Sequence, residues 1–264
     1  MRRRAVSGAL YATPAAVLVV LFFVVPLLLV GWMSLHRWPL LGKPRLNAPA
    51  NYTAIGENAL LHDAVWFTLK YTVLITVSLF ALAFGLALLV QNRRPGVGFF
   101  RTAFFLPMAV GFASASLLFL GLLRSDSPAL GEAVLLVLWR FAGFNMLILL
   151  TGLQAIPLDV YEAARIDGAT RWQLFSRITV PLLRPTIALV LTMMITGSLL
   201  AFDQFWILTR GGPDNSTTSV VMVIYREAFI RLDLGSAAGI SVVLLVLLAL
   251  VSSVQLAVLR RRSA

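Results

Sequence analysis

Residues 161–185, YEAARIDGATRWQLFSRITVPLLRP, form a charged and aromatic segment between two long apolar runs. If those runs cross a membrane, the segment between them lies in water, because ionised side chains are costly within a bilayer. We expect the chain to contact another protein here. This interpretation depends on whether the flanking runs span a membrane.

The composition is that of an integral membrane protein. Of the 264 residues, 59% are hydrophobic and 12% are charged, and the mean hydropathy is +0.90. An average soluble domain has about 25% charged residues. The net charge of +11 does not indicate nucleic-acid binding, because the basic residues cluster at the ends of apolar runs, where they orient a membrane protein. The absence of cysteine excludes disulfides and thiolate sites.

Six stretches are long enough to cross a bilayer as helices, which takes about 20 residues each. They are residues 12–33, 66–90, 102–123, 134–155, 183–206 and 238–259. The first follows three arginines and resembles a signal peptide, but its apolar run is longer than usual and no small-residue cleavage site follows. We therefore expect an all-α integral membrane fold with six transmembrane helices.

The basic residues are distributed unequally between the two sides of such a chain. With six spans both termini share one side, whose thirteen basic residues are Arg2, Arg3, Arg4, Arg93, Arg94, Arg101, Arg165, Arg171, Arg177, Arg184, Arg260, Arg261 and Arg262. The opposite side has only Arg37, Lys43, Arg45, Arg124, Arg210, Arg226 and Arg231. The positive-inside rule then places both termini and residues 156–182 in the cytoplasm. The loops 34–65, 124–133 and 207–237 face outward.

The cytoplasmic segment has the pattern of two short helices. Apolar side chains recur near the helical period at Trp172, Phe175 and Ile178, which favours an amphipathic helix. Upstream, Pro157 and Asp159 are typical of a helix start. Gly168 supplies a break between the two helices. The alternative is a solvated loop whose aromatic side chains lie in the headgroup layer, and periodicity alone does not separate the two.

The same segment carries a motif: Glu162-Ala163-Ala164, then Asp167-Gly168-Ala169, Phe175, Ile178, Pro181 and Pro185. It resembles the EAA loop of binding-protein-dependent ABC importer permeases. The resemblance implies that the segment, between the fourth and fifth spans, is a coupling helix that docks on a separate cytoplasmic ATPase. In that family Glu162 would contact the ATPase and Gly168 would shape the bend. The expected coupling residues are Glu162, Ala163, Ala164, Asp167, Gly168, Ala169 and Phe175.

A second signature follows the fifth span: Phe202-Asp203-Gln204, Leu208-Thr209, Gly211-Gly212-Pro213, Thr217, Thr218, Tyr225, Phe229 and Gly235. It resembles the sugar-transporter branch of the family, and the subunit similar to the maltose and glycerol-3-phosphate permeases. The resemblance covers nearly the whole chain and implies one permease domain, residues 1–264. The outer loop expected at 124–133 is shorter than in relatives, which bears on docking of the solute-binding protein.

Three charged residues, Lys70, Arg140 and Asp203, lie within or near the ends of the expected spans. Lys70 is near an outer end, where its side chain can extend to the membrane surface. Arg140 could do the same. In the maltose-type subunit, however, this part of the fourth span lines the sugar site, so the resemblance makes Arg140, Phe141 and Phe144 candidates to bind substrate. Aromatic rings stack on sugars, and arginine donates to hydroxyls or to a phosphate.

Asp203 and Gln204 are the remaining candidates for the solute site. The two occur together near the end of the fifth span and could bind sugar hydroxyls. A structural role is an alternative: Asp203 could pair with Arg140, or cap a broken helix at the turn Gly211-Gly212-Pro213. Single polar residues such as Asn145 and Ser198 more often bond a neighbouring helix.

No catalytic constellation is present in the sequence. There is no glycine-rich phosphate loop followed by lysine, so ATP hydrolysis is expected in a partner chain. The two histidines, His36 and His62, and the scattered carboxylates indicate no metal or hydrolytic site, and no cofactor is expected. The resemblance implies four kinds of partner: a second permease subunit, two ATPases, an extracytoplasmic binding protein and the lipid bilayer. The implied location is a prokaryotic plasma membrane.

Two other functions remain open at this point. An ion-coupled secondary transporter would need its own coupling residues near the membrane midplane, and only Asp203 is available. A membrane enzyme or scaffold could use residues 161–185 merely to recruit a partner. The sequence favours the permease subunit of an ABC importer for a carbohydrate or carbohydrate-like solute, working by alternating access.

Overall fold

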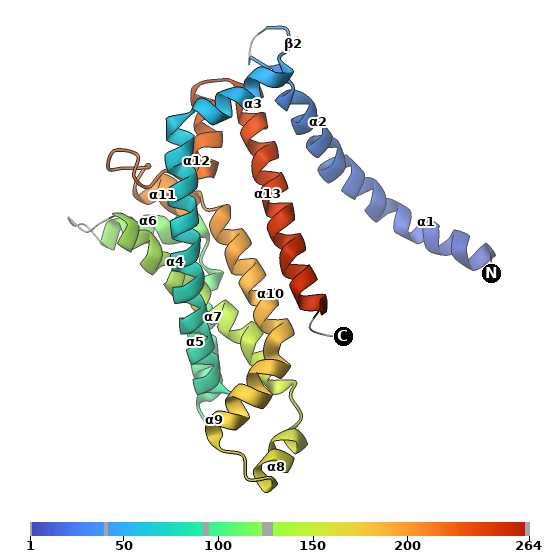
Figure 1. The fold of residues 1–264 in the computed structure, drawn as a ribbon, viewed down its shortest axis with the longest axis vertical. Helices are drawn as coiled ribbons and strands as arrows, with labels where there is room; N and C mark the ends of the chain where they lie inside the picture. The colour runs from blue at the N-terminus through green and yellow to red at the C-terminus, as the bar shows by residue number, and fades with distance from the viewer. Residues whose placement is uncertain (1, 40–41, 92–94, 123–128, 262–264) are drawn as a thin grey trace. The chain divides into compact units, whose positions relative to one another are not determined.

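The computed structural model describes residues 2–39, 42–91, 95–122 and 129–261, and they are largely helical (Figure 1). Arg93, Arg94, Arg124, Asp126 and Arg262 lie outside the described residues, as does the first half of the expected outer loop 124–133. The chain divides into two compact units, which are described separately. One contains Met1–Leu61 and Val223–Leu247, and the other contains His62–Met222 and Leu248–Ala264.

The first unit begins with a long apolar helical run. The helix α1 (Arg2–Val19) continues through a π-helical turn η1 (Val20–Val24) into α2 (Val25–Ser34). Its segment Tyr11–Ser34 is long and apolar enough to cross a membrane, which matches the span expected at 12–33. The two-residue strands β1 (His36–Arg37) and β2 (Arg45–Leu46) pair antiparallel, and α3 (Ala48–Glu57) follows.

The first unit is held together by Asn51 and Gly235. The amide Nδ2 of Asn51 donates to the carbonyl oxygens of Ser34 at 2.8 Å and His36 at 3.0 Å. Gly235 lies at the start of α13 (Leu234–Arg261), and a Cβ there would overlap the carbonyl oxygen of His36. Gly235, which belongs to the sugar-transporter signature, therefore has a structural role, since it lets the start of α13 lie against the chain that follows α2.

The second unit contains most of the helices. They are α4 (Ala59–Val90, from His62 onward), α5 (Val97–Ala109), α6 (Phe112–Leu122), α7 (Ala129–Gln154), α8 (Leu158–Ile166), α9 (Arg171–Gln173), the π-helix η2 (Leu174–Thr179), α10 (Val180–Leu199) and α11 (Asp203–Leu208). The short helix α12 (Val220–Tyr225) and the π-helix η3 (Arg226–Ile230) come before α13.

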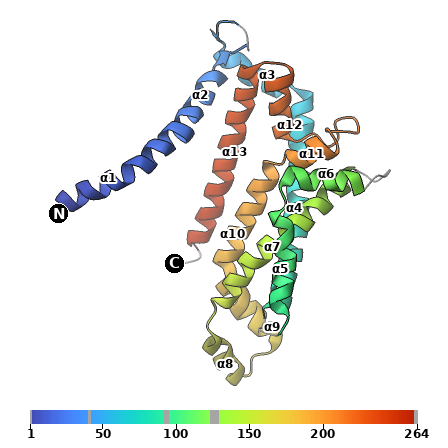
Figure 2. The ribbon, with the colours of Figure 1, turned by 180° about the vertical axis from the view of Figure 1, so that it is seen from behind.

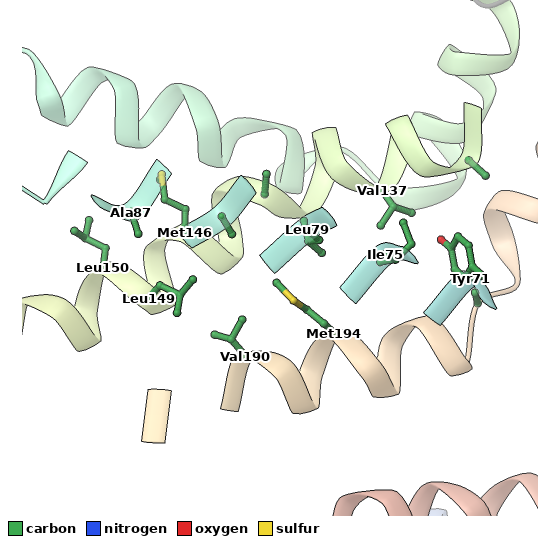
Figure 3. Close-up of a cluster of buried hydrophobic side chains, with 14 of the residues drawn as sticks. Tyr71, Ile75, Leu79, Ala87, Val137, Met146, Leu149, Leu150, Val190 and Met194 are labelled. Atoms are coloured by element: carbon green, nitrogen blue, oxygen red, sulfur yellow. The ribbon is translucent and has the colours of Figure 1, made fainter. Parts of the chain in front are cut away.

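The core of the second unit lies between α4, α7 and α10 (Figure 3). Buried residues recur every fourth position on α4, namely Tyr71, Ile75, Leu79, Ala83 and Ala87, so one face of that helix is covered. Met146, Leu149 and Leu150 of α7 and Val190 and Met194 of α10 belong to the same cluster. The pattern explains why α4 runs as a single long helix.

Five helices are long and apolar enough to cross a membrane, or six if a bent pair counts as one span. The expectation of a continuous third helix at 102–123 is wrong. Instead α5 and α6 meet at 95°. Pro107 lies inside α5 and Gly111 follows its end. Proline removes a helical hydrogen bond and clashes with the preceding turn, and the N–H of Val110 bonds back to the Pro107 carbonyl at 3.2 Å. The helix ends two residues after the proline, at Ala109.

Two glycines let α7 approach its neighbours closely. At Gly143 a Cβ would overlap the Phe104 carbonyl of α5. At Gly152 a Cβ would lie 2.5 Å from the Thr186 Oγ1 and 2.7 Å from the Leu183 Cδ1 of α10. Small residues allow backbones of membrane helices to come together in this way. Gly85, Gly111 and Gly121 make no such close approach.

Candidate functional site

The first candidate site is the coupling segment, which we define as residues 158–179 and which contains α8, α9 and η2 (Figure 2). The helix α8 ends at Ile166, and Gly168, two residues later, has φ +80°. The Gly168 N–H donates to the Arg165 carbonyl at 3.0 Å, and the Ala169 N–H donates to the Ala164 carbonyl at 2.9 Å. These two bonds form a Schellman turn, in which glycine tolerates the left-handed conformation.

The second helix of the coupling segment begins with a capping box at Thr170. The Gln173 N–H donates to the Thr170 Oγ1 at 3.3 Å, and the Thr170 N–H donates to the Gln173 Oε1 at 2.8 Å. Two backbone donors at the helix start are thereby satisfied. Neither residue was among those predicted for coupling, although the T-x-x-Q spacing is a recognised signal for such a start.

The prediction of two helices separated at Gly168 agrees with the structure, but the second is not a separate short helix. Helix α9 continues through η2 into α10 without a break, so the coupling segment is joined directly to a membrane-spanning helix. Phe175 is half-buried there, and its ring centroid lies 6.0 Å from that of Phe84 on α4 and 5.7 Å from that of Trp172. It packs the segment against the second unit.

The remaining predicted coupling residues lie at the surface of α8 and its turn. Glu162, Ala163, Asp167 and Gly168 are exposed, whereas Ala164 and Ala169 are half-buried. Large apolar side chains accompany them: Leu158 is 74% exposed, Ile166 87% and Trp172 72%. Apolar side chains beside a carboxylate give this surface the character of a protein-binding patch.

The second candidate site is a cavity of about 410 Å³ in the second unit. All five residues predicted to bind solute line it: Arg140, Phe141, Phe144, Asp203 and Gln204. They come from α7 and α11, and Tyr71 of α4, Phe112 of α6 and Ser198 of α10 are among the other residues of its wall. A concave site with mostly apolar walls and a few polar groups is typical of small-molecule binding.

Arg140 is buried in the wall of this cavity, with 8% of its surface exposed. Its Nη1 donates to the Pro107 carbonyl at 3.3 Å, and its guanidinium carbon lies 5.2 Å from the Phe112 ring centroid and 5.5 Å from that of Phe141. The side chain therefore does not extend along the helix surface to the headgroups. Lys70, in contrast, is exposed with its Nζ 4.9 Å from the Trp66 ring centroid.

Asp203 and Gln204 lie in the first turn of α11. Gln204 is buried, and its Nε2 donates to the Tyr71 hydroxyl at 3.0 Å. Asp203 is exposed, and among the residues that the structure describes it forms no ion pair with Arg140. The alternative in which these two charges neutralise each other is therefore not supported.

The signature Leu208-Thr209 to Thr217 forms a closed loop and does not involve Asp203. The hydroxyls of Thr209 and Thr217 are hydrogen-bonded at 2.7 Å, the Gly211 N–H donates to the Thr209 Oγ1 at 3.1 Å, and the Thr217 hydroxyl donates to the Gly212 carbonyl at 2.8 Å. The threonine hydroxyls satisfy the backbone of the turn. Within the part of the chain that the structure describes, no group of histidines and carboxylates is arranged to hold a metal ion.

Comparison with known families identifies the family of the whole chain. Residues 4–264 match the model of a family described as "Binding-protein-dependent transport system inner membrane component". The chain belongs to this family. The resemblance found at the EAA-like motif is thus confirmed, and the chain is a multi-pass membrane component of a transport system.

Curated relatives and solved structures are similar over most of the chain. The permease is 32% identical over 276 residues to the arabinooligosaccharides transport system permease protein AraP of Bacillus subtilis, covering 94% of this chain and 86% of AraP. It is 31% identical over 271 residues to the sn-glycerol-3-phosphate transport system permease protein UgpA of Salmonella typhimurium, covering 93% and 91%. A crystal structure of a bacterial ABC transporter that imports alginate has a chain with the same fold, at TM-score 0.77, 22% identity and coverage of 96% and 97%.

Proposed function

We propose that the permease translocates a carbohydrate or carbohydrate-like solute as one subunit of an ABC importer. In this proposal an extracytoplasmic binding protein delivers the solute, and a separate cytoplasmic ATPase powers its passage. The whole chain, residues 1–264, acts as one permease domain whose termini lie in the cytoplasm. Glu162 and its neighbours contact the ATPase, and Arg140, Phe141, Phe144, Asp203 and Gln204 contact the solute.

The observation that carries the proposal is the continuity between the two candidate sites. From the coupling segment, α9 and η2 continue into α10, which reaches the cavity at Met194 and Ser198. The other flank of the segment follows α7, which bears Arg140 and Phe144. A displacement of α8 would therefore be transmitted along two helices to the cavity wall. Rigid-body movement of packed helices is an established way of switching a site between two states.

The coupling segment has the features that an ATPase contact requires. Its first helix exposes Glu162 between the apolar side chains of Leu158 and Ile166. The Schellman turn at Gly168 and the capping box at Thr170 satisfy its backbone locally, so the segment keeps its shape while its surface is free to bind. Phe175 fixes it to α4.

The carbohydrate assignment is supported by the names of relatives. AraP is named for arabinooligosaccharides, and MsmF of Streptococcus mutans, 32% identical over 227 residues with 78% of each chain covered, is named for multiple sugars. UgpA is named for sn-glycerol-3-phosphate. These names include neutral and anionic solutes, so they support the class and leave the individual solute open.

The proposed assembly contains four kinds of partner besides lipid. A second, related permease subunit forms a heterodimer with this chain, two ATPases bind the cytoplasmic side, and a solute-binding protein docks outside. The proposed location is the plasma membrane of a prokaryote, which is the inner membrane in a Gram-negative cell. One solved structure with this fold is a bacterial alginate ABC transporter in complex with a periplasmic protein, and it supports an arrangement of this kind.

The test is uptake of radiolabelled sugars into membrane vesicles that contain the complete transporter, measured with and without ATP. Uptake should require ATP and the ATPase, and Glu162→Lys should reduce it by at least about tenfold, because a cation replaces the carboxylate at the proposed contact. Stimulation of ATP hydrolysis by the binding protein should fall in parallel, while the amount of variant protein in the membrane stays unchanged.

Two results would contradict the proposal. Solute uptake that persists without any ATPase would point to a secondary transporter, and normal uptake by the Glu162→Lys variant would remove the coupling role. Glu162→Gln separates charge from size: it keeps the shape and hydrogen-bonding capacity of the side chain, so it should retain more uptake than Glu162→Lys.

A further inference from the structure

Most polar groups in the cavity already have partners within the protein. The Asn145 Nδ2 donates to the Phe141 carbonyl at 2.9 Å, the Ser198 hydroxyl donates to the Ile195 carbonyl at 3.0 Å, and the Gln204 Nε2 donates to the Tyr71 hydroxyl at 3.0 Å. The two charged residues, Arg140 and Asp203, are therefore the groups with the most unused hydrogen-bonding capacity.

Arg140 is the group whose environment is incomplete. A guanidinium has five N–H donors. Among the described residues, only the Pro107 carbonyl accepts from it, and its Nε is buried without a hydrogen-bond partner. The rings of Phe112 and Phe141 lie beside the cation but offer no acceptor that replaces water. A buried cation with one long hydrogen bond and no counter-ion is unfavourable, so the site lacks a negative charge.

The nearest acidic candidate in the cavity does not supply that charge. Asp203 lines the same cavity, yet it is exposed and forms no ion pair with Arg140. An exposed carboxylate stays solvated and interacts weakly with a cation beyond contact distance. Asp203 is instead placed to accept hydrogen bonds from hydroxyl groups. The cavity thus offers a cation for an acid group and a separate carboxylate for hydroxyls.

We propose that the solute of this permease is an acidic carbohydrate, whose carboxylate, sulfonate or phosphate group binds Arg140 while its hydroxyls face Asp203 and its ring contacts the phenylalanines. Arginine presents a planar fork of donors that matches such oxyanions, and the pair is strengthened by burial. A neutral sugar hydroxyl would leave the guanidinium without its counter-charge. This inference rests on the proposed function and specifies the substrate class at the same cavity.

The experiment compares matched probes on the complete transporter in lipid nanodiscs. Glucose, glucuronate and glucose 6-phosphate are titrated at constant ionic strength, and each Kd is obtained from the rise in the midpoint of thermal unfolding. The acidic probes should bind the wild type at least about tenfold more tightly than glucose. Arg140→Gln should abolish this preference, and Arg140→Lys should keep part of it. Lys70→Gln is the matched control, because Lys70 is also a span cation beside an aromatic ring but does not line the cavity.

The wild type alone is decisive, even if Arg140→Gln does not assemble. Equal Kd values for glucose and the acidic probes, or no binding of any of the three, would overturn the inference. So would a preference for acidic probes that persists in Arg140→Gln or disappears in Lys70→Gln. Arg140 would then serve only to hold the end of α5 through Pro107. Vesicle uptake that depends on ATP but favours neutral sugars would refute this inference alone, whereas uptake without ATPase would refute the proposed function.

Discussion

The coupling segment and the crossing of α5 and α7 are both built around a glycine, but the two glycines act differently. Gly168 adopts a left-handed conformation, and a Cβ there would meet no atom within 4 Å. Gly143 lies in the middle of α7, where a Cβ would overlap the backbone of Phe104. The first region is therefore determined by bonds between near neighbours in sequence, and the second by contact between two distant helices.

This difference separates what can be altered locally from what supports the whole second unit. The coupling segment closes its own hydrogen bonds, so it can lose some order while α7 and α10 stay packed. At the α5–α7 crossing, Gly143 directly precedes Phe144, so the crossing positions a residue of the cavity wall. A substitution at Gly143 therefore disturbs the packing of α5 against α7.

The largest effect is expected for Gly143→Ala. The added Cβ must push α7 away from α5, and overpacking of this kind typically costs about 1–3 kcal/mol; the overlap with backbone places this variant at the upper end of that range. The midpoint of thermal unfolding of the purified transporter should fall by several degrees, and solute binding should weaken because Phe144 shifts.

Gly85→Ala on α4 is the matched control for this change. Gly85 also lies inside a helix, but a Cβ there meets no atom within 4 Å, and alanine is the better helix former by about 1 kcal/mol. The control should leave stability unchanged or raise it. Similar losses for the two variants would show that the close approach at Gly143 does not determine the packing.

A smaller effect is expected for Gly168→Ala. A non-glycine residue in the left-handed region costs about 1–2 kcal/mol, and the bend between α8 and α9 should become less populated. Uptake should fall severalfold while the thermal midpoint of the transporter changes little. Gly96→Ala makes a suitable comparison, since Gly96 has φ +89° and equally open surroundings but lies before α5. Equal loss of uptake in both variants would mean that backbone strain, and not the bend, causes the defect.

The same distinction explains how much the sequence could predict. Five of the six spans, the break at Gly168 and the helix start near Pro157 follow from local rules and from apolar runs, and they agree with the structure. The five residues predicted for the solute site do lie around one cavity, but that prediction came from resemblance to a family. Their contact with solute stays a prediction.

Tertiary contacts could not be predicted in this way. Nothing in a single sequence indicates that Gly143 and not Gly85 meets another backbone, because the partner Phe104 is remote in the chain. The continuous third span was wrong for a related reason: proline within an apolar run is compatible with either a kinked helix or a broken one, and only the packing of α5 against α7 decides. The sequence also did not indicate that Arg140 contacts the Pro107 carbonyl and the Phe112 ring.

The smallest effect is expected for Thr170→Ala, which removes the N-cap of the second helix in the coupling segment. Losing such a cap costs about 1 kcal/mol, and the Gln173 N–H would lose its acceptor. Hydrogen exchange should accelerate at the amides of residues 171–173 and remain unchanged in α7. Ser176→Ala is the control, because the Ser176 hydroxyl bonds to the Trp172 carbonyl within the same helix and contributes little there. Faster exchange throughout α7 in Thr170→Ala would show that the coupling segment and the cavity wall unfold together, and that the segment is not a locally closed unit. Exchange confined to the segment would instead support a coupling element that can change its contacts without loosening the helices it moves.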